Sequence, residues 1–544
     1  MAENTAGTGF RHFGTMIDCS RNAVMTVDTL KKWIDLTADL GYNTLMLYTE
    51  DTYEIPGEPY FGYMRGRYTE KELKEIDDYA AEKGMELIPC IQTLAHLNAI
   101  VRWPAYREHV DTDDILLAGD EAVYHLIDKM FRTISRTFRS RTVNIGMDEA
   151  HMIGRGKYQD LHGYEDRTEI FLTHIRKVAE LGKKYGLELL IWSDMFFRLA
   201  SGGSYYDSQI RLDKSVKKLI PDNVGLVYWD YYSADRKRYA NMLKAHRAIK
   251  SGSWFAGGLW SWSGPVPHNA FSIRCNKAAI ESCREAGVED VFLTLWGDDG
   301  NACSRFATLP ALFHAAEVAK GNTDEELIRA RFLEKFGISF ERFMLLDLPG
   351  TPGYSESEIF NPEKYLLYND PFTGLLDSTL TGSEGEQYGV AARLLKYQKD
   401  QGEWSYIFET LHDLAAVLQL KAELGNRTRL VYKSRSKEAL KALIADYDVL
   451  NRRLRHFHKT FQRQWFKENK PHGFDVMDIR LGGLIQRVTS CRERLKALLD
   501  DEITRIDELE ETRLDYNGNE TFFEGKPIEM NNWRRTVSAN VVDW

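Results

Sequence analysis

The run "TVNIGMDEAH", from Thr142 to His151, joins a short apolar segment to two adjacent carboxylates, Asp148 and Glu149. A strand that leads into acidic side chains is typical of barrel enzymes, whose active sites lie at the C-terminal ends of the strands. Neighbouring side chains on a strand point to opposite faces, so a pair that acts together is not expected side by side. The run therefore poses one question about the fold and another about the chemistry.

Similar runs recur over residues 13–320, and amphipathic helical stretches separate them. They are "FGTMIDCS", "NTLMLYTE", "MELIPCIQT", "LELLIWSD", "VGLVYWDY", "WFAGGLWSW" and "DVFLTLWGDD". Alternation of short apolar runs with helical patterns is the signature of repeated βα units. With the first run they predict an α/β fold, a (β/α)8 TIM barrel. The alternative, an open doubly wound sheet, is disfavoured because no GxGxxG turn is present.

After Gly321 the strand signal fades and the pattern becomes helical. An apolar stripe recurs at helical spacing through Met477, Leu481, Leu484, Ile485, Val488, Cys491, Leu495, Leu498 and Leu499. We expect two domains, a catalytic barrel over residues 1–325 and an α-helical C-terminal domain over residues 326–544. A Pro- and Gly-rich passage at 347–365 lies near this junction.

The composition of the chain disfavours some classes of binding partner. A formal net charge of −10 over 544 residues disfavours nucleic acid, whose binding proteins usually carry a basic face. Neither a signal peptide nor an apolar span of membrane length is visible, so we expect a cytoplasmic protein without a membrane partner. The six cysteines have no metal-binding spacing, and no cofactor is implied. A homodimer is a further candidate assembly.

Polar and aromatic side chains end the predicted strands, as a barrel active site requires. Trp192, Trp260, Trp262 and Trp296 could stack on the apolar faces of a pyranose, while Asp, Glu and Arg side chains bind its hydroxyls. A metal site built from His151 and the acid pair is disfavoured, because three ligands so close in sequence rarely converge on one ion. We therefore expect a sugar-binding cleft without metal.

Glycoside hydrolysis explains the adjacent carboxylates. Ordinary retaining enzymes place a nucleophilic carboxylate about 5 to 5.5 Å from the acid, across the sugar. Asp148 and Glu149 have Cα atoms only about 3.8 Å apart and so approach the sugar from one side. The pair fits a mechanism in which the 2-acetamido oxygen of the substrate attacks the anomeric carbon. One carboxylate then balances the positive charge of the oxazolinium ring, and the other serves as acid and base.

The segment "NIGMDEAH" resembles the signature of glycoside hydrolase family 20, the β-N-acetylhexosaminidases. The resemblance implies that Asp148 orients the acetamido group and that Glu149 is the general acid. "VYWDYY" resembles the sixth strand of the family, which implies Tyr228 as the donor to the acetamido oxygen and Asp230 as a polar contact. The chain is most similar to the bacterial exo-acting branch, in which the barrel begins at the N-terminus and a helical region follows.

Further motifs follow in the family's order. "MIDCSR" implies Arg21 as a ligand of ring hydroxyls, and "IWSD" implies Trp192 as a pocket wall. "LWGDDG" implies Trp296 as a second wall and Asp298 as a contact of the outer hydroxyls. His96 takes the place of a third-strand histidine near the acid, although Ala95 replaces the family's glycine.

The expected activity is removal of terminal non-reducing β-linked N-acetylglucosamine, with N-acetylgalactosamine as a further candidate, and with retention of configuration. The terminal N-acetylhexosamine of an oligosaccharide or glycoconjugate is thus the expected partner. Two alternatives remain open. One is a retaining β-glycosidase whose nucleophile is a carboxylate on another strand, such as Asp298. The other is a sugar-binding barrel without catalysis.

Overall fold

The structure is a computed structural model that describes residues 7–209, 217–218, 220–352, 359–396, 399–516, 518 and 529–539. The chain divides into two compact units. The barrel unit comprises Met1–Leu259, Ser272–Trp296 and Leu312–Thr323, and the helical unit comprises Trp260–Phe271, Gly297–Ala311 and Asp324–Trp544. The expected domain boundary at residue 325 stays a prediction.

Eight parallel strands close into a barrel in chain order, with β1 paired to both β2 and β8. The strands are β1 His12–Asp18, β2 Thr44–Tyr48, β3 Glu86–Cys90, β4 Thr142–Asn144, β5 Glu188–Trp192, β6 Val224–Trp229, β7 Trp254–Gly258 and β8 Asp290–Leu295. Each predicted run overlaps one of them. The prediction of a TIM barrel followed by a helical C-terminal region is confirmed.

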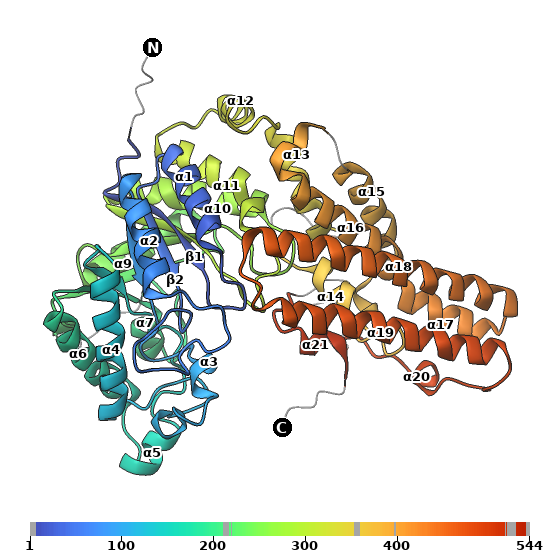
Figure 1. The fold of residues 1–544 in the computed structure, drawn as a ribbon, viewed down its shortest axis with the longest axis horizontal. Coiled ribbons are helices and arrows are strands. Elements are labelled where there is room, and N and C mark those ends of the chain that lie inside the picture. The colour runs from blue at the N-terminus through green and yellow to red at the C-terminus, as the bar shows by residue number, and fades with distance from the viewer. Residues whose placement is uncertain are drawn as a thin grey trace. The chain divides into compact units, whose positions relative to one another are not determined.

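Helices alternate with the strands and surround them (Figure 1). They are α1 Val27–Asp39, α2 Glu70–Glu82, α3 Asn98–Val101, α4 Glu121–Thr137, α5 Lys157–His162, α6 Arg167–Lys184, α7 Asp194–Ser201, α9 Arg236–Ile249, α10 Asn269–Glu285 and α11 Leu309–Ala319. Helix α1 shows why they form here. Thr26 caps its N-terminus by accepting from the backbone N–H of Thr29, and Leu30, Trp33 and Ile34 form its buried stripe.

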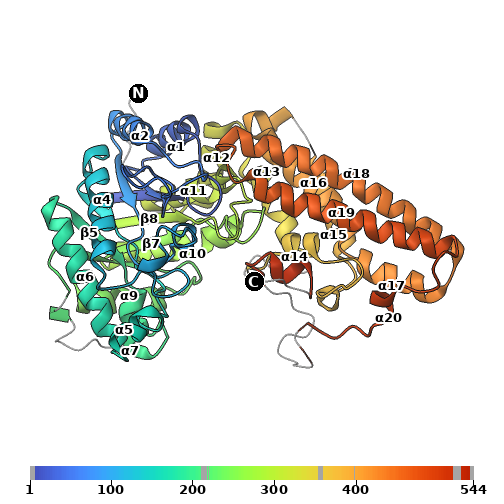
Figure 2. The same ribbon diagram turned by 60° about the horizontal axis from the view of Figure 1, so that its bottom comes forward.

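The later helices are α12 Glu325–Phe336, α13 Phe340–Met344, α14 Pro362–Tyr368, α15 Glu384–Leu395, α16 Ser405–Lys421, α17 Leu424–Ser434, α18 Lys437–Glu468, α19 Phe474–Leu499, α20 Asp507–Glu510 and α21 Arg534–Val537. Short 3₁₀ helices are η1 Arg107–His109, η2 Arg305–Thr308, η3 Leu345–Gly350, η4 Asp377–Thr379 and η5 Lys399–Trp404. Figure 2 shows α16, α18 and α19 side by side. The predicted stripe on α19 is buried from Met477 to Cys491 and at Leu495.

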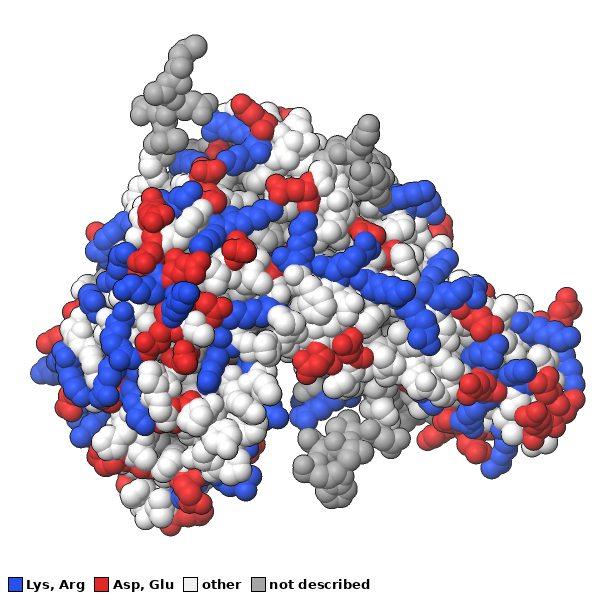
Figure 3. Space-filling view, viewed as in Figure 1, with Lys and Arg blue, Asp and Glu red and all other residues white. Residues whose placement is uncertain are grey.

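Lys and Arg side chains are interspersed with Asp and Glu over the face shown in Figure 3. All six cysteines are buried, and none of them forms a disulfide. In the part of the chain that the structure describes, no helix is both long enough and apolar enough to span a bilayer.

Candidate active site

The acid pair lies in a loop after β4 and not on the strand itself. The strand ends at Asn144, four residues before Asp148. Gly146, Met147 and Glu149 have φ values of 71°, 69° and 54°, in the left-handed region that side chains other than glycine rarely adopt. This corrects the expectation that the pair ends the strand. Because the backbone turns here, the two side chains need not point to opposite faces, as neighbouring side chains on a strand do.

Gln92 holds this loop from β3. Its amide oxygen accepts from the backbone N–H of Met147 at 2.9 Å, and its nitrogen donates to Asp148 Oδ1 at 2.8 Å and to Tyr48 at 3.0 Å. A Cβ on Gly146 would lie 2.0 Å from the Gln92 oxygen, so the position needs glycine. Gln92 is fully buried, and its three bonds fix which end of the amide faces the carboxylate.

His96 forms an ion pair with the acid pair. Its Nε2 lies 3.3 Å from Asp148 Oδ2 and 3.7 Å from Glu149 Oε2. Burial opposes the imidazolium, but the negative charge of Asp148 outweighs it and raises the pKa of His96 to about 9. Burial also opposes the Asp148 carboxylate, yet His96 and Gln92 lower the pKa of Asp148 below its ordinary value. Asp148 is therefore held as a charged carboxylate at neutral pH.

Glu149 occupies a different environment. Its side chain is 42% exposed, whereas that of Asp148 is 12% exposed. Asp194 accepts from the backbone N–H of Glu149 at 3.1 Å and from Arg198 Nε at 3.2 Å. Burial, with the charge of Asp148, raises the pKa of Asp194 to about 7. The guanidinium of Arg198 lies 3.7 Å from Glu149 Oε1. Helix α7 therefore contributes two groups to Glu149: Asp194, which binds its backbone N–H, and Arg198, whose positive charge lies beside its carboxylate.

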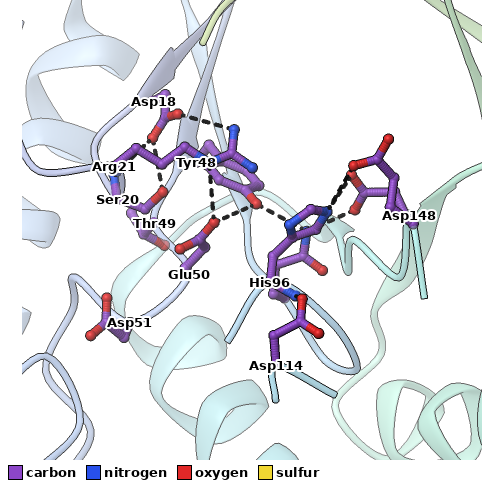
Figure 4. A network of polar contacts seen from close by, with 12 residues as sticks. Asp18, Ser20, Arg21, Tyr48, Thr49, Glu50, Asp51, His96, Asp114 and Asp148 are labelled. Carbon is purple, nitrogen blue, oxygen red and sulfur yellow. Dashed lines mark hydrogen bonds and ion pairs between the residues drawn. The ribbon is translucent and has the colours of Figure 1, made fainter. Parts of the chain in front are cut away.

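Arg21 lies in a second group of charges, which Figure 4 shows with His96 and Asp148. Its guanidinium is 3.5 Å from Asp18 and 3.6 Å from Glu50. Tyr48 donates to Glu50 at 2.9 Å. Burial raises the pKa of Glu50 to about 7, although the nearby Arg21 opposes this. Because Tyr48 bonds to both Glu50 and Gln92, the group is continuous with the loop of the acid pair.

Trp296 is the centre of an aromatic wall. Its ring lies 5.7 Å from that of Trp192 and 4.8 Å from that of Tyr48, and the Arg21 guanidinium lies 4.9 Å from its centre. Its indole N–H donates to Tyr231 at 3.0 Å. The structure therefore brings Arg21, Trp192 and Trp296 together, as expected for the end of a sugar pocket.

Tyr228 and Asp230 lie in a different cluster. The Tyr228 hydroxyl donates to Asp230 at 3.0 Å, and its ring stacks 4.6 Å from that of His246 on α9. Arg238, also on α9, donates to Asp230 at 2.8 Å. Tyr228 is fully buried between β6 and this helix. Among the described residues, no contact joins Tyr228 to the acid pair, so the geometry does not support the role that the resemblance implies for it.

The remaining predicted residues belong to the helical unit. Trp260 and Trp262 stack on each other with ring centres 4.2 Å apart, and both are buried. Asp298 lines a pocket of this unit beside Asp299, whose carboxylate pairs with Lys364 at 2.6 Å. The sugar-binding roles of these three predicted residues stay predictions. Within the described residues, His, Cys, Asp and Glu side chains form no group of three or more that could hold a metal ion.

Sequence reasoning missed Gln92, Arg198 and Tyr231. Glu50 and Asp194 each end one of the predicted runs, but no motif gives either of them a role. Gln92 and Glu50 stand in the quoted runs after β3 and β2, where position at a strand end was the available signal. Tyr231 stands three residues after Tyr228 in the same run, "VYWDYY". No sequence signal pointed to Arg198, because an arginine about one turn into a helix is ordinarily an exposed surface cation.

Two family models match the chain. "Glycosyl hydrolase family 20, catalytic domain" matches residues 10–255, and "Glycoside Hydrolase 20C C-terminal domain" matches residues 341–526. Hexosaminidase D of Homo sapiens is 25% identical over 260 residues, which are 45% of this chain and 50% of that protein. The β-hexosaminidase of Vibrio furnissii is 24% identical over 228 residues, 34% of this chain and 37% of that protein. The chain thus spans about half the length of the human relative that it matches.

Two solved structures are weaker matches. The exo β-N-acetylglucosaminidase of Vibrio harveyi, in complex with N-acetylglucosamine, is 16% identical with a TM-score of 0.45, over 62% of this chain and 58% of that one. The β-N-acetylhexosaminidase of Bacteroides fragilis is 20% identical with a TM-score of 0.45, over 64% of this chain and 71% of that one. The assignment rests on the two family models, which together cover more than half of the chain in the expected order. The chain belongs to glycoside hydrolase family 20.

Proposed function

We propose that the protein is an exo-acting β-N-acetylhexosaminidase that removes terminal β-linked N-acetylglucosamine by substrate-assisted, retaining catalysis. One observation carries the proposal: two adjacent carboxylates lie in different environments on one loop. Asp148 is buried and its pKa is lowered by His96 and Gln92, whereas Glu149 reaches solvent. The first environment suits a fixed negative charge, and the second suits a group that exchanges protons with substrate and water.

In the first step Glu149 protonates the glycosidic oxygen while the acetamido oxygen of the substrate closes on the anomeric carbon. Asp148 accepts a hydrogen bond from the acetamido N–H and balances the charge of the oxazolinium ring. In the second step Glu149 takes a proton from water, which opens the ring and retains configuration. The charged His96 keeps Asp148 ionised throughout, because a protonated Asp148 could not balance the positive charge.

Tyr231, in place of Tyr228, is the proposed donor to the acetamido oxygen. Its hydroxyl accepts from the indole of Trp296 at 3.0 Å, which places it beside the aromatic wall of the proposed sugar site. The proton of Tyr228 is already given to Asp230. Asp230 is correspondingly proposed as a structural partner of Tyr228 and Arg238.

The aromatic wall and its neighbouring charges would bind the sugar ring. Trp192 and Trp296 offer ring faces for stacking, and Arg21 with Glu50 offers a donor and an acceptor to the hydroxyls. Asp298, Trp260 and Trp262 remain candidates for further contacts with the sugar.

We also propose a homodimeric, cytoplasmic enzyme that uses no cofactor, nucleic acid or membrane. The six cysteines, none of which forms a disulfide, support a reducing compartment, and light scattering would measure the assembly.

Paired substrates test the proposal. An aryl N-acetyl-β-glucosaminide should be cleaved, whereas the matching aryl β-glucoside should not, because it lacks the acetamido oxygen. A thiazoline analogue of the cyclised intermediate should inhibit competitively. Equal cleavage of the two substrates would instead support a protein nucleophile. Binding of N-acetylglucosamine without cleavage of any aryl N-acetylhexosaminide would support a sugar-binding barrel.

A further inference from the structure

The exposed large hydrophobic side chains of the barrel unit share one location. In the part of this unit that the structure describes, each lies between the end of a strand and the outer helix that follows it. They are Tyr60, Tyr63 and Met64 after β2, Met152, Leu161 and Tyr164 after β4, and Tyr232 after β6. These segments form the face of a barrel on which ligands bind. Exposed apolar groups gathered on one face indicate an interaction site.

Three aromatic rings form a compact cluster on this face. The ring of Trp103, which follows α3, lies 5.5 Å from that of Tyr60 and 5.5 Å from that of Tyr63. Tyr60 and Tyr63 are 6.0 Å apart, at 73° to each other. They are 44% and 42% exposed. The indole therefore supports two tyrosine rings that remain open to solvent.

The segment that carries the tyrosines is held in place by its own contacts. Gly62 and Met64 have φ values of 65° and 59°, which set a tight turn. Glu58, at the start of this turn, accepts from Tyr106 at 2.8 Å and pairs with Lys129 at 2.6 Å. Tyr106 follows Trp103 in the next segment, so the two segments are joined. Preorganised rings lose little conformational entropy when a ligand binds.

The cluster is continuous with the candidate active site. Arg65 pairs with Asp51 at 3.0 Å and donates to the backbone carbonyl of Ser20. Asp51 follows Glu50, and Ser20 precedes Arg21. Tyr63 stands two residues before Arg65, a chain length of at most about 7 Å. The segment that carries the tyrosines is thus anchored, through Arg65, to the neighbours of Arg21 and Glu50.

We propose that Tyr60, Tyr63 and Trp103 bind a sugar of the leaving-group part of an oligosaccharide substrate. This rests on the proposed hydrolase function. Pyranose rings present apolar faces that stack on aromatic side chains, and the tyrosine hydroxyls can bond to sugar hydroxyls. The two tyrosines expose on the order of 200 Å², which matches one sugar ring and falls far below the roughly 800 Å² that each partner contributes to a stable dimer.

The test compares two substrates in a Tyr60→Ala/Tyr63→Ala variant. We expect kcat/KM for an N-acetylglucosamine trisaccharide to fall about tenfold or more, as for the loss of one stacking contact. For an aryl N-acetyl-β-glucosaminide, whose leaving group is small, kcat/KM should stay within about twofold. A Tyr60→Phe/Tyr63→Phe variant, which keeps both rings, should retain most of the trisaccharide activity. Tyr164→Ala is the matched control, since Tyr164 is 76% exposed on another segment of the same face.

Binding separates this proposal from the proposed function. In a Glu149→Gln background, calorimetry should show weaker trisaccharide binding when both tyrosines are replaced, with N-acetylglucosamine binding unchanged. This binding measurement can be made even if the wild-type protein hydrolyses no substrate. An equal loss for both substrates, or no loss for either, would overturn the proposal. So would a change from dimer to monomer in light scattering, which would identify the cluster as an interface between copies of the chain.

Discussion

His96 and Asp148 form a buried ion pair, with Nε2 3.3 Å from Oδ2, in which each partner shifts the pKa of the other toward its charged form. The pair comes from two loops that follow neighbouring strands, β3 and β4. A nearby amide donor, Gln92, completes the environment of the carboxylate. The carboxylate next to it in sequence, Glu149, is left outside this environment, and its side chain is 42% exposed whereas that of Asp148 is 12% exposed.

Asp148→Asn should lower kcat for an aryl N-acetyl-β-glucosaminide by roughly 10²- to 10⁴-fold. The amide keeps the shape of the side chain but cannot balance an oxazolinium charge. Thermal unfolding should still show a folded protein, and Asp160→Asn, an exposed substitution on α5, should leave kcat unchanged. A loss of less than about fivefold would remove Asp148 from the proposed mechanism.

His96→Gln should destabilise the protein in a pH-dependent way. The folded pKa of His96 is about 9, above its ordinary value of 6.5, so the ion pair contributes its full stability below pH 6.5 and loses it as the pH rises through 9. Urea unfolding should therefore show a deficit of about 1 to 3 kcal/mol at about pH 6 that shrinks at about pH 10. An equal deficit at both pH values would show that His96 is neutral in the folded protein.

The barrel could be predicted from sequence because its strands are continuous buried runs between amphipathic helices, and both patterns depend on local spacing. Side-chain direction was harder to predict. Tyr228 and Tyr231 stand in one run of aromatic residues, and only the end of β6 at Trp229 decides which of them faces the helices. The interaction of Gln92 with Asp148 depends on a left-handed turn at Gly146 and Met147, which the order of motifs does not reveal.

Gln92→Glu tests that interaction. The new carboxylate would replace a donor 2.8 Å from Asp148 Oδ1, and two carboxylates that share a site cannot both ionise freely. We expect kcat/KM to fall on the order of 100-fold at neutral pH, as for the loss of one electrostatic donor. The deficit should narrow at lower pH, where a protonated Glu could donate again. Gln486→Glu, an exposed change on α19, makes the same charge change and should have no effect on kcat/KM.

Tyr231→Phe and Tyr228→Phe distinguish the two tyrosines. Loss of the Tyr231 hydroxyl should lower kcat about 10²- to 10³-fold and weaken thiazoline binding, because the acetamido oxygen loses its donor. Loss of the Tyr228 hydroxyl leaves the buried Asp230 with Arg238 but without its phenol, so we expect about 1 to 3 kcal/mol of destabilisation and kcat within a few fold of wild type. Turnover and urea unfolding measured on both variants decide the assignment. The opposite pattern, with turnover lost in Tyr228→Phe, would return the acetamido contact to Tyr228 and require β6 to present that side chain to the sugar.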